Sequence, residues 1–226
     1  MTGFLQATWI ILCKDLKELW RGKNLFFSLL VFAALFQVIL SLVLDARQRL
    51  FAEAGGGILW LPILFASLLS FQRHVSSESR DGGWLGLMTA PIDRGAIFLA
   101  KMSANLVLVL AIEAISVPLF FLFFAHPAPL QPGLLAATLL LGTWGFVSLG
   151  SFLSVMSSGS RLGELLLPLL LFPLSIPLLL GVVELTGRAL YPTLPGGEGV
   201  WFAILVAYDV IFTLLPLLLY EFLLEV

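Results

Sequence analysis

The amino-acid sequence predicts an all-α integral membrane protein with six transmembrane helices. Of its 226 residues, 60% are hydrophobic and only 12% are charged, and the mean hydropathy is +1.06. Soluble domains carry about 25% charged residues, so a soluble core could not bury this much apolar side chain. A helix that crosses a bilayer needs about 20 mainly apolar residues, and six such runs account for most of the chain. We therefore expect a single transmembrane domain, residues 1–226.

The first predicted element, residues 4–21, is an amphipathic helix and not a span. Its apolar stripe consists of Trp9, Leu12, Leu16, Leu19 and Trp20. Five charged residues between positions 14 and 21 occupy the rest of its surface. An apolar face bordered by tryptophan is typical of helices that lie in the plane of the membrane interface, and we expect that placement here. A soluble amphipathic arm is the alternative.

Six apolar runs follow, each read as a span. They are residues 25–44, 55–71, 97–124, 134–156, 165–185 and 200–224. The second is short and rich in glycine, and the third is long enough to require tilt. Pro168, Pro173 and Pro177 fall in a single run, which predicts a bent or broken helix. Proline does not exclude a span, because neighbouring helices or water satisfy the backbone groups that it frees.

Lysine and arginine are distributed unevenly between the two sides of the predicted bundle. With the N-terminus inside, nine of the twelve basic residues fall on cytoplasmic segments, and only Arg47, Arg49 and Arg188 fall outside. Basic residues in short loops favour the cytoplasmic side. We therefore expect both termini to be cytoplasmic, together with the polar segment between the second and third spans. The net charge of −2 gives no support for nucleic-acid binding.

Two acidic residues, Glu113 and Asp209, lie inside predicted spans. An ionisable group at that depth costs about 3 kcal/mol on insertion scales and usually faces the bundle interior or water. Both are candidates for a translocation path or a proton relay. The alternative at each position is a protonated or hydrogen-bonded residue that only packs.

The sequence predicts no catalytic or metal site. No H-E-x-x-H or G-x-S-x-G motif occurs, and His74 and His126 fall on opposite sides of the predicted membrane. The stretch Arg21-Gly22-Lys23-Asn24 lacks the upstream glycine and the Ser or Thr of a P-loop. We therefore expect the chain to bind no cofactor directly and to have no enzymatic activity by itself.

Small residues crowd the fourth run. They are Gly142, Thr143, Gly145, Ser148, Gly150, Ser151 and Ser154. Small side chains let membrane helices approach closely. We expect them to pack within the bundle, and a seam between two copies of the chain is the second interpretation.

The polar segment ESRDGGWLGLMTAPIDRGAIFLAK, which begins at Glu78, predicts a short helix at about residues 81–90. Asp81 is placed to cap its start and Pro91 to end it, while Gly82 and Gly83 allow the turn. Its apolar side is formed by Trp84, Leu85 and Met88. Asp93 is then placed to cap the next span. Such a surface suits a partner protein, and a helix lying on lipid is the alternative.

Several stretches resemble one known family. They are Asp81-Gly82, Leu87, Pro91, Leu99-Ala100-Lys101, Gly142-Thr143, Leu167-Pro168 and Pro173-Leu174-Ser175-Ile176-Pro177-Leu178-Leu179. Together they are similar to the haem exporter B family, the CcmB permease of cytochrome c maturation, over nearly the whole chain. The chain departs from the pattern at Trp84-Leu85, where the family commonly has Leu-Glu, so the acid is missing.

The resemblance implies an ABC-2-like permease driven by a separate CcmA-like ATPase, which would hold the ATP. The cytoplasmic helix would then be the coupling helix, with contact residues Glu78, Asp81, Gly82, Gly83, Trp84, Leu85, Leu87, Met88 and Pro91. Implied partners are CcmC-like and CcmD-like membrane proteins, a CcmE-like haem chaperone and a second permease copy in the bacterial inner membrane. The implied function is to couple ATP hydrolysis to haem delivery or to release of the haem-loaded chaperone, with haem as the cargo of the complex.

Two other classes of function compete with this one. A proton-driven secondary carrier would use Glu113 and Asp209 and would transport without ATP. An assembly scaffold would have no transport path and would tolerate substitution of both acids.

Overall fold

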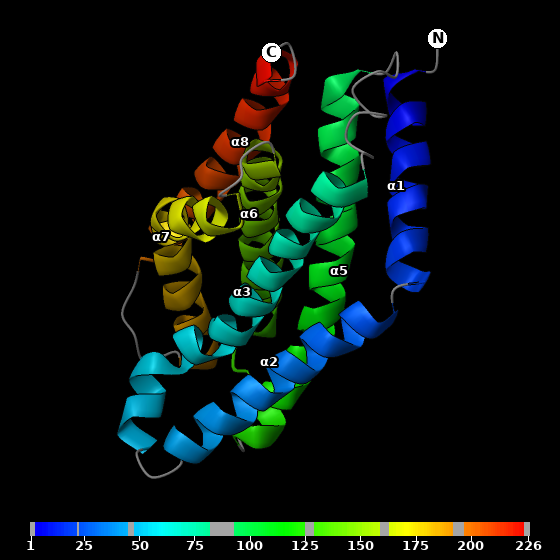
Figure 1. Cartoon of the computed structure of the whole chain (residues 1–226). Helices are drawn as coiled ribbons and strands as arrows, with labels where there is room; N and C mark the ends of the chain where they lie inside the picture. Colours follow the sequence, from blue (N-terminus) through cyan, green and yellow to red (C-terminus); the bar gives the residue numbers. More distant parts are fainter. Residues whose placement is uncertain are drawn as a thin grey trace.

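The computed structural model describes residues 3–21, 23–44, 48–81, 93–124, 129–158, 163–191 and 197–223. These residues form seven helices and no strand (Figure 1). The helices are α1 (Phe4–Arg21), α2 (Lys23–Leu44), α3 (Gln48–Asp81), α5 (Arg94–Phe123), α6 (Pro132–Ser158), α7 (Gly163–Leu190) and α8 (Glu198–Leu223). Every helix except α1 contains an apolar stretch long enough to cross a bilayer, which confirms the predicted all-α membrane fold.

The six apolar stretches lie close to the predicted spans. They are Phe26–Leu44, Gly55–Gln72, Gly95–Phe123, Pro132–Ser157, Leu165–Leu190 and Glu198–Leu219. The fifth continues past Leu185, where the sequence predicted its end. The guanidinium of Arg188 donates to Glu184, one turn earlier on α7, at 2.6 Å, so a charged pair is accommodated within the helix.

Helix α6 packs against four other helices, α3, α5, α7 and α8. Its glycines allow the close approach. A Cβ at Gly142 would collide with Trp60 and Val182, and one at Gly150 would collide with the ring of Phe71. These contacts confirm that the small residues of the fourth span pack within the bundle, as expected for membrane helices.

Helices α1 and α2 together follow the length of α5. In Figure 1, α1 lies beside the upper part of α5, where Ala7 and Ile11 are buried. Lower down, the amide of Gln37 on α2 donates to the backbone oxygen and the hydroxyl of Ser116 at 2.9 and 2.8 Å. Ser41 donates to the carbonyl of Phe123 at 3.0 Å. The first two helices therefore pack against α5 end to end.

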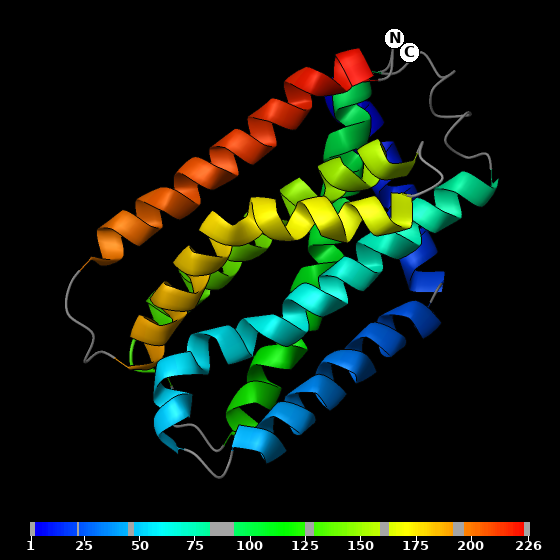
Figure 2. The same ribbon diagram turned by 60° about the vertical axis from the view of Figure 1, so that its left-hand side comes forward.

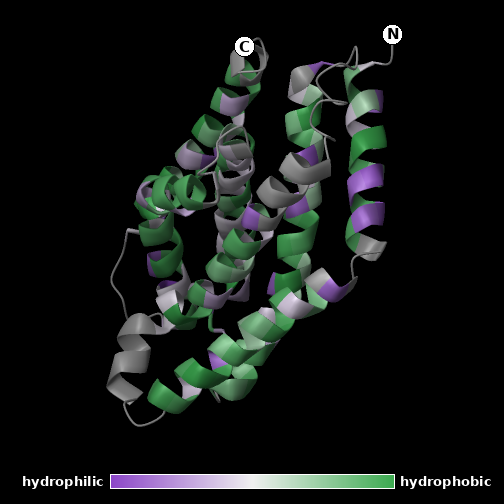
Figure 3. Ribbon diagram, viewed as in Figure 1, coloured by the Kyte–Doolittle hydropathy of each residue, from purple (hydrophilic) through white to green (hydrophobic). Residues whose placement is uncertain are grey.

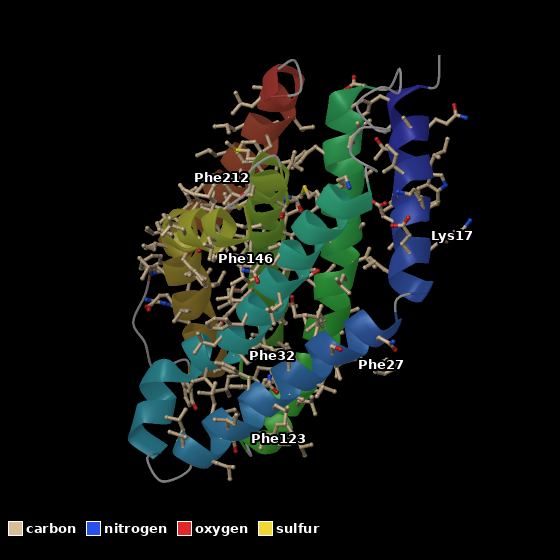
Figure 4. All side chains as sticks on the ribbon, viewed as in Figure 1. Lys17, Phe27, Phe32, Phe123, Phe146 and Phe212 are labelled. Carbon is tan, nitrogen blue, oxygen red and sulfur yellow. The ribbon has the colours of Figure 1, made fainter. Side chains whose placement is uncertain are left out.

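One side of α1 stays open. Figure 3 shows hydrophobic and hydrophilic residues alternating along this helix, and in Figure 4 Lys17 points away from the bundle. Trp9, in the predicted apolar stripe, is 65% exposed, while Leu12 and Leu16 are half-buried. Leu12 and Leu19 pack against the buried core, so the bundle covers part of the predicted stripe and leaves Trp9 open. Placement of α1 at the membrane interface stays our prediction.

Helices α7 and α3 bend, and both contain proline. Figure 2 shows α7 changing direction along its length, so the triple-proline span is bent and not broken. Side chains bond carbonyls at this bend: Ser175 donates to Phe172 at 3.0 Å, and Tyr208 of α8 donates to Leu174 at 3.2 Å. Helix α3 also bends in its first half, which contains Pro62, a proline that our reading of the spans missed.

Candidate functional site

The predicted coupling helix falls mostly on residues 82–92, which lie outside the described residues. Seven of the nine predicted contact residues are therefore not described: Gly82, Gly83, Trp84, Leu85, Leu87, Met88 and Pro91. Glu78 and Asp81 belong to the last turns of α3, and their side chains are also outside the description. The short helix at 81–90 stays a prediction.

Two helices flank this segment. Helix α3 ends at Asp81, and α5 begins at Arg94. The carboxylate of Asp93 accepts a hydrogen bond from the backbone N–H of Gly95 at 2.8 Å, which confirms Asp93 as the N-cap of α5. In Figures 1 and 2 the end of α3, the start of α5, the start of α1 and the end of α8 lie toward the same end of the bundle.

Both supporting helices reach α6 at neighbouring residues. The ring of Phe71 on α3 packs against Gly150, and its centroid lies 5.9 Å from that of Phe146. The amide of Asn105 on α5 donates to the hydroxyl of Ser151 at 3.0 Å. These contacts lie ten and eleven residues from the ends that flank the segment, or about 15 Å along each helix. The end of α3 and the start of α5, over similar lengths, thus connect the segment to α6.

Glu113 is buried in α5, and its carboxylate accepts one hydrogen bond from the described residues. Its side chain is 5% exposed, and the hydroxyl of Thr143 on α6 donates to Oε2. Ser116, the partner of Gln37, lies three residues further along α5. Glu113 therefore belongs to a polar strip that links α5 to α6 on one side and to α2 on the other.

Asp209 is buried in α8 but has no comparable donor. Its side chain is 7% exposed, and among the described residues neither carboxylate oxygen has a hydrogen-bond partner. It lies against Gly145 of α6, where a Cβ would collide with Oδ1. The missing side chain at Gly145 is what makes room for this carboxyl group.

The structure does not bring the two acids into one site. Thr143 and Gly145, which mark where they meet α6, are two residues apart. Two residues correspond to about 200° around an α-helix, so the acids approach α6 at one level from nearly opposite sides. A direct relay between them would have to pass around this helix.

The sequence patterns did not identify the residues that form the buried hydrogen bonds between helices. Thr143 and Ser151 were recognised only as small residues, and Gln37 and Asn105 were not singled out. Both amides interrupt apolar runs, which was the available signal, because buried amides need hydrogen-bond partners. Among the described residues, no group of three His, Cys, Asp or Glu side chains is placed to hold a metal ion.

The fold and these buried contacts define a multi-pass α-helical membrane protein whose spans are joined by interhelical hydrogen bonds. Residues 6–220 match the family described as CcmB protein. The chain belongs to this family, as its loop and proline motifs had indicated.

Curated relatives carry the name Heme exporter protein B. The protein from Rhodobacter capsulatus is 35% identical over 158 residues, covering 69% of this chain and 72% of the relative. The protein from Paracoccus denitrificans is 33% identical, covering 79% and 81%. The protein from Pseudomonas aeruginosa is 32% identical, covering 88% of each.

Proposed function

We propose that this chain is the membrane permease subunit of an ABC-type system for haem export in cytochrome c maturation. One observation carries the proposal: the family match extends over residues 6–220, and a relative that the chain covers over 88% of its length is named Heme exporter protein B. The subunit hydrolyses no ATP itself. A separate CcmA-like ATPase binds the nucleotide and acts on the permease from the cytoplasm.

The segment between α3 and α5 receives the ATPase. Its two flanking helices contact α6 at Gly150 and Ser151, so a displacement of the segment acts on α6 through both of them. Trp84, Leu85 and Met88 form the contact surface. Because Leu85 stands where the family commonly has an acid, apolar packing replaces an ionic contact at this position.

The complex contains two permease copies, CcmC-like and CcmD-like membrane proteins and a CcmE-like chaperone. Both termini face the cytoplasm of the bacterial inner membrane, as the distribution of basic residues favours. ATP hydrolysis drives haem delivery or release of the haem-loaded chaperone. Glu113 and Asp209 are candidates for lining a translocation path.

Co-purification tests the coupling surface. The tagged chain is co-expressed with the ATPase encoded beside it, solubilised and captured, and bound ATPase is quantified. We expect the double variant W84A/L85D to lose at least about 90% of the bound ATPase, since a charge replaces apolar contact area. The control is Leu130→Asp, an exposed residue just before α6, which should retain wild-type binding. If the double variant binds the ATPase at the wild-type level, the segment between α3 and α5 is not the ATPase contact.

A proton-driven carrier is the competing function. The placement of Glu113 and Asp209 on opposite sides of α6 lends it little support. Its test is transport by the chain alone in liposomes under a pH gradient, measured for wild type and Glu113→Gln. ATP-independent transport that Glu113→Gln abolishes would favour the carrier over the proposed permease.

A further inference from the structure

The carboxyl group of Asp209 lies where three helices meet. Gly145 of α6 lies against Oδ1, and Leu178 of α7 lies beside the same glycine. The preceding residue, Tyr208, donates to the carbonyl of Leu174, which precedes Pro177 by three residues. Asp209 is therefore fixed at the proline bend of α7, in the contact between α6 and α8.

An ionised carboxylate is poorly matched to this position. The side chain is 7% exposed, and neither oxygen accepts a hydrogen bond from the described residues. A buried charge without a donor or counter-charge is far more costly than a buried neutral group. Glu113 differs, because Thr143 supplies a donor to its carboxylate.

Charged and titratable groups on the packed helices offer Asp209 no counter-ion in the described contacts. Helices α5, α6 and α7 pack against α8. Their groups, together with those of α8 itself, are Arg94, Lys101 and Glu113 on α5, Glu164, Glu184 and Arg188 on α7, and Glu198, Tyr208, Tyr220 and Glu221 on α8. Helix α6 contributes none between Pro132 and Ser158.

We propose that Asp209 is a proton-binding site whose proton is held while α8 packs against α6. The bound proton removes the negative charge of the carboxyl group that lies against Gly145. When α8 separates from α6 and water reaches the carboxyl, the proton is released. The packed arrangement thus binds one more proton than the separated one, so lower pH favours packing and higher pH favours separation. Such a proton site belongs to the chain alone and does not depend on the ATPase.

Infrared spectroscopy tests the proposal without an activity assay. The full chain is reconstituted in phosphatidylcholine–phosphatidylglycerol vesicles at neutral pH, and wild type is compared with Asp209→Asn. We expect the variant to lose a carbonyl band of a protonated carboxyl. In wild type, the ratio of protonated to ionised Asp209 should fall about tenfold per pH unit. Asp93→Asn, at the exposed N-cap of α5, should lose no such band. Superimposable wild-type and Asp209→Asn spectra would overturn the proposal.

A second measurement needs no variant and applies if Asp209→Asn does not fold. Dicyclohexylcarbodiimide adds to protonated carboxyl groups in apolar surroundings, and peptide mapping locates the adduct. The proposal expects an adduct at Asp209 in the wild-type chain that declines as pH rises, with none at the exposed Glu18. An Asp209 peptide that stays unmodified at every pH would count decisively against a bound proton.

Discussion

Glu113 and Asp209 are both carboxyl groups buried in apolar helices, and they meet α6 within one turn of each other. Glu113 faces a hydroxyl, that of Thr143, which donates to it. Asp209 faces Gly145, which has no side chain, and receives no donor from the described residues. Two buried carboxyl groups therefore lie in different environments: the one of Glu113 has a hydrogen-bond donor, and the one of Asp209 has none among the described residues.

The two acids differ in hydrogen bonding because of the α6 residues that they face. At Thr143 the helix provides a hydroxyl donor, and two residues later, at Gly145, it provides no side chain. A satisfied buried acid joins helices, because its removal leaves a donor unpaired. A buried acid without a hydrogen-bond donor lowers the free energy of unfolding. Such groups are retained in membrane proteins mainly where function requires them. We therefore expect α5–α6 to be the more permanent contact and α6–α8 to be the one that changes.

The largest effect is expected from filling the space at Gly145. In Gly145→Ala the new methyl group collides with Asp209 and Leu178, so the free energy of unfolding should fall by about 1–3 kcal/mol. Denaturing-detergent titration in mixed micelles measures this change. Gly133→Ala is the matched control on α6, since its new Cβ would meet no described atom within 4 Å beyond its chain neighbours and the adjacent backbone of its own helix. Equal stabilities would show that the Gly145 contact is not tight.

Removing the donor to Glu113 should have the next largest effect. Thr143→Val keeps the shape of the side chain but leaves the buried carboxyl without its hydrogen bond, which costs about 2 kcal/mol. The same titration measures it. Thr143→Ser retains a hydroxyl and should recover most of the loss. If valine and serine behave alike, the hydrogen bond does not stabilise the α5–α6 contact.

Replacing Asp209 should change stability in the opposite direction. Asp209→Leu exchanges an unpartnered carboxyl for an apolar group of similar branching, so the free energy of unfolding should rise by about 1 kcal/mol. Glu113→Leu, measured in parallel, should lower it. Should both substitutions destabilise equally, the contrast between the two acids would not hold.

The smallest effect is expected at the α7 bend. Tyr208→Phe removes one hydroxyl, which donates to the carbonyl of Leu174, and interhelical hydrogen bonds in membranes are worth about 0.6 kcal/mol. The ring contact with Phe212, whose centroid lies 4.4 Å away, should persist. Repeated unfolding titrations must resolve a loss of this size. A loss several times larger would mean that Tyr208 also holds the bend itself.

Much of this fold could be predicted from the sequence, because each span is one run of apolar residues that can be recognised without knowing its neighbours. Runs of apolar residues located the six apolar spans, and Asp93 was recognised as a cap from its position alone. The partners of the acids could not be predicted in this way. Whether Thr143 or Gly145 faces an acid depends on the rotation of α6 against the four helices that pack on it, and no local period encodes that rotation. The continuation of α3 to Asp81 was missed for a related reason, since polar residues after Gln72 end an apolar run without ending a helix.

The length of α3 has a mechanical consequence. Its 34 residues correspond to about 50 Å of helix, whereas the apolar part of a bilayer is about 30 Å thick. The helix rests on α6 at Phe71, and about 15 Å of it continues beyond this point to Asp81. We therefore expect a displacement of the polar end of α3 to reach the contact at Phe71 first. Further along the same helix, the indole of Trp60 donates to the hydroxyl of Thr186 on α7 at 2.9 Å, so α7 is the next element on which such a displacement would act.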